Sequence, residues 1–420
     1  MVLFDGSEVF LMKMKIVVIS GLLFGFFVFL SLEKGPDLQL VQTQGSQDEK
    51  FWTFDGHLHP TSSAAGRGGD IGDGLDPQFS LSLAEQGGLG AGFFNTSVDE
   101  FYEANHLAVK EVVRQFDHFY RQIGMYPDQI GVATNGDEVR ALRSQNKLAA
   151  ILSIEGAIAI ESDLGVLRML HRLGLREMNL VHNLANNIGD VMYTTGKGSG
   201  LTDYGSELVT EMNRLGIVID LSHTSEQTIM DVIAASTQPV TTTHSGARAL
   251  VDRPGNWSDE MIQALAAKGG VICTAFLPQQ VSQEYDRKWH GGRQRGSGIM
   301  GLEPLVYRGD PTKIYDFIAE RRGGGGSGRM ASERHQDIPP LSYLIDTIDY
   351  IVRLVGADHV GISSDWGGYP VNILDIEGAG EYQNIAQALL QRGYSREDVA
   401  KIMGENLLRV FDEVVSTARQ

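Results

Sequence analysis

Residues 216–233, GIVIDLSHTSEQTIMDVI, contain the pattern that decides the fold. The first half is a short apolar run rich in β-branched residues, which is typical of a buried strand. Ser225 then stands where the N-cap of a helix belongs, and the apolar residues after it are spaced as on one face of a helix. The stretch therefore predicts a strand that is followed directly by an amphipathic helix.

The same alternation of strand and helix recurs from residue 51 onward. Eight short apolar runs are predicted to be strands: FWTFDG (51–56), AGFFNTSV (91–98), LAAILSIEG (148–156), REMNLVHN (176–183), GIVIDLSH (216–223), QPVTTTHS (238–245), GGVICTAF (269–276) and DHVGISSDW (358–366). Amphipathic segments lie between several of them, at 100–123, 203–215, 225–235, 258–268 and 341–355. Nearly continuous apolar strands that alternate with helices predict an α/β fold, a parallel (β/α)8 barrel of the TIM type.

The composition of the 420 residues limits the classes of function. The formal net charge of −18 at pH 7 argues against a nucleic-acid-binding surface, because nucleic acid is bound chiefly by Lys and Arg. The single cysteine, Cys273, cannot form an intramolecular disulfide, and one cysteine is too few for a cysteine-based zinc site. Any metal ion must therefore be held by His, Asp and Glu.

The first part of the chain differs from the rest. Two lysines precede an apolar run at 16–32, and this arrangement indicates an export signal. We expect residues 1–35 to be a cleaved signal peptide or an uncleaved signal anchor, followed by a polar linker at 36–50 and the barrel domain at 51–415. The sequence thus predicts an exported protein, periplasmic or extracellular, which an uncleaved anchor would tether to the membrane.

Polar residues stand at the ends of most of the predicted strands. They are His57 and His59 after the first strand, Glu155 after the third, His182 after the fourth, His223 after the fifth, His244 after the sixth and Asp365 after the eighth. The carboxyl ends of barrel strands meet at one rim, where the active sites of this fold lie. We therefore expect these residues, which are far apart in the sequence, to surround one site.

The ligand types predict a centre of two metal ions. Imidazole and carboxylate ligands suit zinc, and a carboxylate has two oxygens with which to bridge two ions. We assign His57, His59 and Glu155 to one zinc ion. Glu155, as the bridge, joins His223 and His244 at the other.

The same centre would supply the attacking group. Zinc lowers the pKa of bound water to about 7, so a hydroxide shared by the two ions is available at neutral pH. Asp365 is the natural group to orient that hydroxide and later to pass its proton to a leaving amine.

The strand-end motifs are more specific when they are taken in order. They are DGHLHP (55–60), SIEGA (153–157), LVHN (180–183), GIVIDLSHTSEQTIMDVI (216–233), PVTTTHSGARAL (239–250), DHVGISSDWGG (358–368) and MGENLLRVF (403–411). From about Phe51 to Phe411, this set resembles the membrane dipeptidase (renal dipeptidase) family of zinc peptidases within the amidohydrolase superfamily. The resemblance implies a metal-dependent hydrolase barrel that cleaves dipeptides, including those with a D-residue at the carboxyl end.

The resemblance also implies a role for each residue that matches a motif. It places His57, Glu155, His223 and His244 among the metal ligands, with Glu155 as the bridge. His182 matches the histidine that contacts the scissile carbonyl and its oxyanion, Arg253 the arginine that pairs with the substrate, and Asp365 the catalytic acid and base. For Arg253 the chemistry agrees, because a guanidinium matches a carboxylate and a dipeptide carries a free carboxyl terminus.

One residue departs from the family pattern. The family usually has Asp where this chain has His59, and this exchange of a carboxylate for a neutral imidazole raises the charge of the site by one. It leaves open a second hypothesis, a binuclear amidohydrolase that acts on N-acyl amino acids or lactones. A third is a catalytically silent barrel used as a binding module, which the complete set of strand-end ligands argues against. The size is compatible with a homodimer, although no residue identifies an interface.

Overall fold

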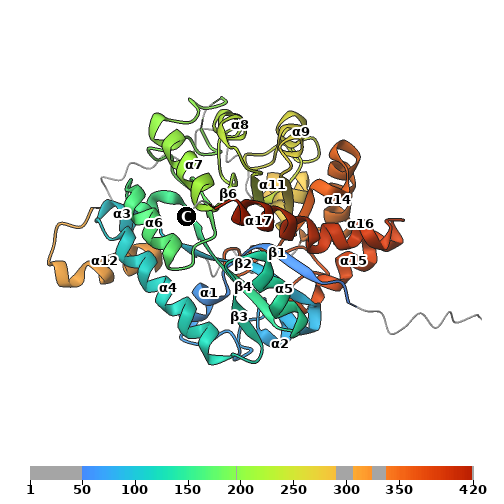
Figure 1. Ribbon diagram of the computed structural model, residues 1–420, viewed down its shortest axis with the longest axis horizontal. Coiled ribbons are helices and arrows are strands. Elements are labelled where there is room, and N and C mark those ends of the chain that lie inside the picture. Colours follow the sequence, from blue (N-terminus) through green and yellow to red (C-terminus); the bar gives the residue numbers. More distant parts are fainter. Residues whose placement is uncertain (1–49, 195, 290–305, 324–336, 419–420) are drawn as a thin grey trace, which may run out of the picture. The chain divides into compact units, whose positions relative to one another are not determined.

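The computed structural model describes residues 50–418 except 195, 290–305 and 324–336 (Figure 1). The described part contains nine strands: β1 Thr53–Leu58, β2 Leu89–Ser97, β3 Ile130–Val132, β4 Leu148–Glu155, β5 Glu177–Asn179, β6 Val218–Asp220, β7 Thr241–Ser245, β8 Val271–Ala275 and β9 Val360–Ser363. Every pairing between them is parallel. The eight predicted strands are all present.

Eight of the described strands close into a ring. The order around it is β1, β2, β4, β5, β6, β7, β8 and β9, and β9 pairs with β1 again. The predicted (β/α)8 barrel is therefore confirmed. The short strand β3 was not predicted; it pairs with β4 outside the ring, and its three residues are too few to show a strand pattern in the sequence.

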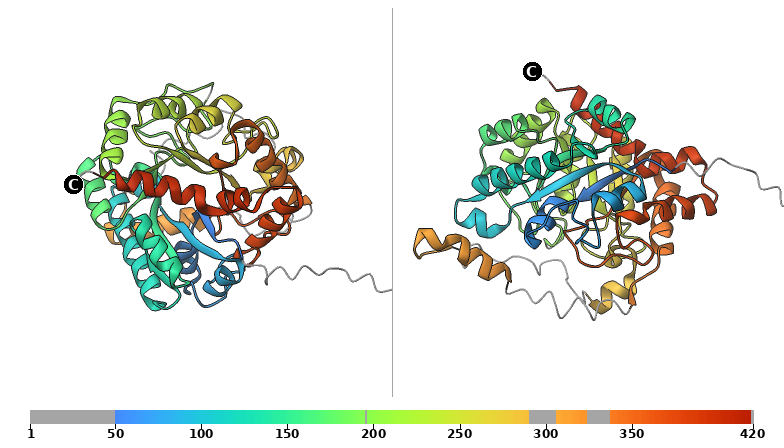
Figure 2. Two further views of the ribbon diagram at one scale, coloured as in Figure 1. Left: turned by 45° about the vertical axis from the view of Figure 1, so that its right-hand side comes forward. Right: turned by 90° about the horizontal axis from the view of Figure 1, so that it is seen from below.

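Helices surround the ring (Figures 1 and 2). They are α1 Pro60–Arg67, α2 Leu81–Gly87, α3 Glu100–Ala104, α4 Ala108–Met125, α5 Gly136–Ser144, α6 Leu164–Arg172, α7 Asp203–Leu215, α8 Glu226–Ala235, α9 Asp259–Ala267, α10 Pro278–Val281, α11 Gln283–Trp289, α12 Ile314–Gly323, α14 Ser342–Val355, α15 Tyr382–Gln391, α16 Arg396–Ala400 and α17 Asn406–Ser416. The five predicted amphipathic segments are all helical. The segment 100–123 is split into α3 and α4 by a turn, in which His106 has a positive φ of 55°.

The predicted helix starts at Ser225 and Ser258 are confirmed in detail. The Ser225 side chain accepts a hydrogen bond from the backbone N–H of Thr228, and Ser258 accepts one from Met261. Each cap satisfies one of the backbone donors left free at the start of a helix, which is worth about 1 kcal/mol. These caps fix the points at which the chain turns from the strand ends into α8 and α9.

Helix α17 closes the amino end of the barrel. Figure 2 shows this helix lying across the ring of strands, and its Phe411 packs edge to face on Phe93 of β2 with 6.0 Å between ring centroids. Phe93 packs in turn on Phe54 of β1 at 5.0 Å. All three rings are buried. This apolar cluster fills one end of the barrel and leaves the other end for the polar side chains at the carboxyl ends of the strands.

The predicted signal or anchor at 1–35 and most of the linker at 36–50 lie outside the described residues. Among the residues that the structure does describe, no helix is both long enough and apolar enough to cross a membrane.

Candidate active site

Glu155, at the carboxyl end of β4, lies at the centre of the candidate site. Five imidazole nitrogens surround its carboxylate: the distances from Oε1 are 3.2 Å to His223 Nε2, 3.4 Å to His182 Nε2, 3.6 Å to His57 Nε2 and 3.8 Å to His244 Nε2, and Oε2 lies 3.5 Å from His59 Nε2. The structure thus brings together the histidines that the sequence singled out. Strands β1, β4, β5, β6 and β7 all supply or precede a member of this cluster.

Four of the imidazoles form two pairs. His57 Nε2 lies 3.0 Å from His59 Nε2, and His223 Nε2 lies 2.8 Å from His244 Nε2. At these distances one nitrogen of each pair donates to the other, or both nitrogens bind one metal ion in place of the shared proton. Neutral imidazole is the commonest metal ligand in proteins. The residues present therefore fit divalent metal ions.

Asp365, which follows β9, lies on the side of the first pair. Its Oδ1 is 3.7 Å from His59 Nε2 and 4.0 Å from His57 Nε2. Burial raises the pKa of this carboxyl to about 7, against the opposing effect of the charge of His57. A group with a pKa near neutrality can both take up and release a proton at working pH.

Alternation along β1 explains the first pair. His57 and His59 are two residues apart, so their side chains lie on the same side of the strand, and their ring centroids are 4.8 Å apart. The buried Leu58 between them packs in the main apolar core. This spacing is the arrangement that the sequence predicted.

His223 and Asp365 occupy an unusual backbone conformation. Their φ angles are 65° and 57°, in the left-handed region that residues other than glycine seldom adopt. Hydrogen bonds hold both: the backbone N–H of Met192 donates to the His223 carbonyl at 2.6 Å, and Asp365 N–H donates to the His57 carbonyl at 2.8 Å. Strain of this kind costs about 1–3 kcal/mol per residue and concentrates at functional sites.

Burial and the charge of Glu155 set the protonation of the cluster. Burial lowers the pKa of His59 to about 3 and that of His182 to about 4, and it holds the pKa of His244 well below its usual range. At His57 the hydrogen bond and charge of Glu155 outweigh burial and raise the pKa to about 9. Although burial opposes ionisation of Glu155, the charge of His182 and hydrogen bonds from His223 and His57 hold its pKa well below the usual range. At neutral pH the centre without metal therefore combines an ionised Glu155 with neutral imidazoles at His59, His182 and His244 and a protonated His57. His57 must lose its extra proton to bind metal.

The sequence did not identify two buried aspartates beneath this cluster. Asp55 Oδ1 accepts from the backbone N–H groups of His57 at 2.8 Å and Ser364 at 3.1 Å. Asp220 is near His57 and His244 and could be taken for a ligand of a third metal group. Its carboxylate already accepts four hydrogen bonds from Ser222 and Thr243, so it orients its neighbours. The sequence did contain a signal for them, because Asp55 and Asp220 are charged residues inside the apolar runs of β1 and β6.

Arg253 lies outside the cluster around Glu155. Its Nε donates to Asp286 Oδ1 of α11 at 3.1 Å, and its side chain is mostly buried. Its guanidinium approaches Gly255, where an added Cβ would lie 3.7 Å from Arg253 Nη1. Because Gly255 also lines a pocket that contains His223, Arg253 approaches this region from the side of the β7–α9 loop.

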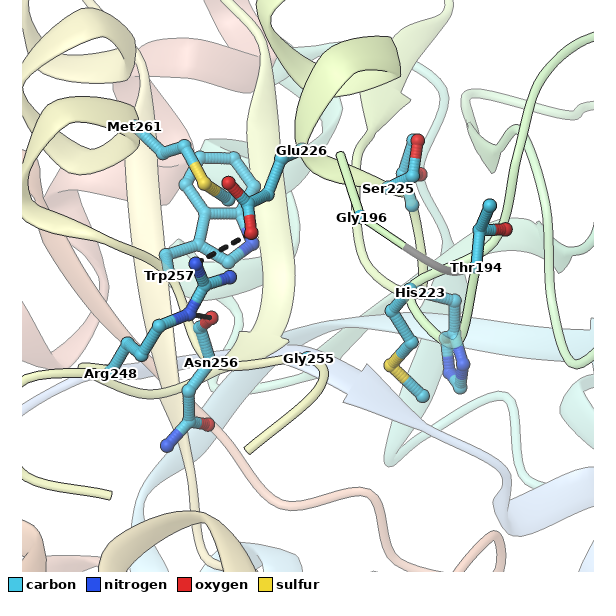
Figure 3. A pocket seen from close by; sticks show the side chains of 12 residues that line it. Thr194, Gly196, His223, Ser225, Glu226, Arg248, Gly255, Asn256, Trp257 and Met261 are labelled. Atoms are coloured by element: carbon cyan, nitrogen blue, oxygen red, sulfur yellow. Dashed lines mark hydrogen bonds and ion pairs between the residues drawn. The ribbon is translucent and has the colours of Figure 1, made fainter. Parts of the chain in front are cut away.

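The pocket beside His223 has two different walls (Figure 3). His223 and Thr194 lie on one side, and the ion pair between Arg248 and Glu226, with 2.7 Å between Nη1 and Oε1, lies on the other. Trp257 is next to this ion pair. The sequence did not predict this ion pair, because Glu226 begins α8 and Arg248 lies 22 positions further on, in the loop after β7.

The family model for membrane dipeptidase, peptidase family M19, matches residues 46–420. The chain belongs to the membrane dipeptidase family. It is therefore a hydrolase that acts on peptide bonds, as the sequence predicted. The buried cluster of His, Asp and Glu is the part of this chain that could hold the metal on which such an activity depends.

Similar proteins span most of this chain. Dipeptidase tcpJ of Claviceps purpurea is 28% identical over 372 residues, which cover 87% of this chain and 73% of the relative. Dipeptidase aclJ of Aspergillus oryzae is 28% identical over 409 residues, which cover 94% and 84%. A solved structure, the probable dipeptidase PvdM from Pseudomonas aeruginosa, is 27% identical with a TM-score of 0.71, covering 88% of this chain and 96% of that one.

Proposed function

We propose that the protein hydrolyses dipeptides with two zinc ions held around Glu155. The observation that carries the proposal is the position of one carboxylate between two imidazole pairs. Glu155 Oε2 lies 3.5 Å from His59 Nε2, whereas Oε1 lies 3.2 Å from His223 Nε2. Oε1 is also 3.6 Å from His57 Nε2, so the carboxylate lies within reach of both pairs, as a bridging ligand requires.

The chain's own residues divide the remaining work. Zinc bound at this centre supplies Lewis acidity, which lowers the pKa of water to about 7 and polarises a carbonyl. Asp365 takes the proton from the attacking water and passes it to the amine as the C–N bond breaks. His182, on the other side of Glu155, donates a hydrogen bond to the oxyanion. Arg253, held by Asp286, pairs with the free carboxyl terminus of the substrate.

The choice of dipeptides rests on the relatives. Two fungal relatives are named dipeptidases. A metallopeptidase from Rhodobacter sphaeroides, which shares the fold at 22% identity, was solved with a phosphinate mimic of L-Ala-D-Ala. That ligand makes L-Ala-D-Ala and L-Ala-L-Ala the first pair of substrates to compare, and it motivates the proposal that a D-residue is accepted at the carboxyl end.

We also propose that the protein is exported and that residues 1–35 direct the export. The apolar run at 16–32 after two lysines supports this proposal. Cell fractionation together with amino-terminal sequencing of the mature protein tests it. Recovery of the full chain in the cytosol would reject the proposal.

The function is tested with Glu155→Ala and His223→Ala. Both variants should lose dipeptide hydrolysis and bind less zinc, because each substitution removes a proposed metal ligand. Dipeptides are compared with N-acetylated dipeptides and N-acyl amino acids. Activity that does not need a free amino group would favour an acyl amino acid hydrolase, for which His59 in place of the family's Asp is the motivating feature. Full activity in metal-free protein would reject the mechanism.

A further inference from the structure

The hydroxyl of Thr243 contacts an imidazole from each predicted metal site. Thr243 lies in β7, directly before His244, and is fully buried. Its Oγ1 is 3.1 Å from His57 Nδ1 and 3.1 Å from His244 Nδ1. His57 is assigned to one ion and His244 to the other. One hydroxyl group therefore contacts a proposed ligand of each metal ion.

Asp220 determines where the proton of this hydroxyl points. Thr243 Oγ1 donates to Asp220 Oδ2 at 2.7 Å, which is the shortest of the contacts made by the hydroxyl. Asp220 Oδ1 accepts from Thr243 N–H at 2.9 Å and from the N–H and hydroxyl of Ser222 at 2.9 and 2.8 Å. An ionised carboxylate only accepts hydrogen bonds, so the single proton of Thr243 must point to Asp220.

The two lone pairs of the hydroxyl then face the two imidazoles. An imidazole that binds metal is neutral and carries one proton, and an acceptor beside Nδ1 favours that nitrogen as the place of the proton. This leaves the Nε2 lone pairs of His57 and His244 free, and both Nε2 atoms face Glu155, at 3.6 and 3.8 Å from its Oε1. As an acceptor beside both Nδ1 atoms, the hydroxyl thus favours the tautomer that can bind metal in both halves of the centre.

The other polar neighbours cannot replace this hydroxyl. Asn95 Nδ2 lies 2.9 Å from His57 Nδ1. An amide NH2 group only donates, so it cannot accept the proton of His57 and by itself favours the opposite tautomer, which Thr243 must outweigh. Ser222 Oγ lies 3.3 Å from Thr243 Oγ1, and its own proton goes to Asp220. Thr243 is therefore the acceptor common to both imidazoles.

We propose that Thr243 is a positioning residue shared by the two metal sites, and that Asp220 orients its hydroxyl. The proposal rests on the two-metal function proposed above. It adds that the affinities for the two ions depend on one hydroxyl group, so that both should change when this group is removed.

The test compares Thr243→Val, Thr243→Ser and Thr241→Val in the full chain. Valine keeps the shape of threonine without the hydroxyl, and serine keeps the hydroxyl. Thr241→Val is the matched control, because Thr241 lies on the same strand and its hydroxyl donates to the Val271 carbonyl at 2.9 Å. Zinc affinity is measured by competition with a chelator, and the visible spectrum of the cobalt-loaded protein reports the ligand geometry.

Thr243→Val should bind both ions about 10- to 100-fold more weakly, which is the usual effect of removing a group that orients metal ligands. It should also change the cobalt spectrum. Thr243→Ser should remain close to the wild type, and Thr241→Val should bind metal normally even if it is less stable. Unchanged affinity in Thr243→Val, or loss at only one ion, would overturn the proposal. If the wild type binds a single ion, the proposal that Thr243 serves two metal sites is overturned.

Asp220→Asn provides a second route if Thr243→Val does not fold. An amide N–H in place of Oδ2 would donate to Thr243 and turn the hydroxyl proton toward the imidazoles, so the affinity for both ions should again fall. Normal affinity in this variant would also overturn the proposal. A wild type that binds two ions but cleaves no dipeptide would reject only the proposed function, because the metal measurements need no substrate.

Discussion

The two ends of the barrel are built from opposite kinds of residue. At the amino end, Phe54, Phe93 and Phe411 form an apolar cluster that α17 covers. At the carboxyl end, imidazoles and carboxylates crowd around Glu155, and His223 and Asp365 have strained backbones. Apolar burial stabilises a fold, whereas buried polar groups and strain cost stability. The comparison indicates that one end maintains the fold, whereas the other holds the candidate active site.

The largest expected effect is on the rate, at the carboxyl end. Asp365→Asn keeps the shape of the side chain but cannot take up a proton, so kcat/KM for a dipeptide should fall by about 10²- to 10⁴-fold. The thermal unfolding temperature should stay the same or rise, because the substitution removes a carboxyl that is costly to bury. Metal content is measured as the control. Near-normal turnover with normal metal content would reject the role of Asp365.

A change at the amino end should have the opposite result. Phe411→Ala removes a fully buried ring and should lower the free energy of unfolding by about 3–5 kcal/mol. The folded fraction should keep its kcat/KM, because the ring contacts no residue of the candidate site. Denaturant titration measures the loss, and Val113→Ala, at an exposed apolar residue of α4, is the control. A large fall in kcat/KM of the folded protein would show that the two ends are not separable.

Glu177 sharpens the comparison with a smaller effect. This residue begins β5 and is buried, and burial together with the charge of Asp220 raises its pKa well above the ordinary value of 4.5. The folded chain therefore binds this proton more tightly than the unfolded chain. The stability that this proton gives is complete below pH 4.5 and is lost as the pH rises toward the folded-state pKa.

Glu177→Gln removes this dependence on pH. Relative to the variant, the wild type should lose about 1.4 kcal/mol of unfolding free energy per pH unit over that range. Denaturant titrations at several pH values measure the difference. Parallel profiles for the two proteins would show that Glu177 has an ordinary pKa.

The barrel and the cluster around Glu155 could be predicted because both follow from local patterns. Each strand is an apolar run, and the polar residue that ends it lies at the same rim as the others. His57 and His59 needed only the two-residue repeat of a strand. The position of Asp365 beside this pair follows from the pairing of β9 with β1, which closes the ring.

The remaining parts of the site depend on distances that no local pattern contains. Thr243 reads as one of three consecutive threonines in a strand, and its sequence gives no sign that the hydroxyl lies between two imidazoles. Arg253 pairs with Asp286 of α11, and Arg248 pairs with Glu226 of α8. Both arginines lie in the loop between β7 and α9, whose path is set by packing. Such contacts link residues 22 or 33 positions apart, and only the folded chain brings them together.

The covering of the barrel by α17 has a consequence for the order of folding. Strand β1, at Thr53–Leu58, pairs with β9 and packs against α17, at Asn406–Ser416. During synthesis the apolar surface of Phe54 and Phe93 therefore has no permanent cover until the ribosome has made the chain as far as residue 416. Contacts of such high sequence separation form slowly, and exposed apolar surface promotes aggregation in the interval. A nascent chain stalled before α17 should accordingly be a substrate for chaperones, even though every ligand of the candidate site has already been translated.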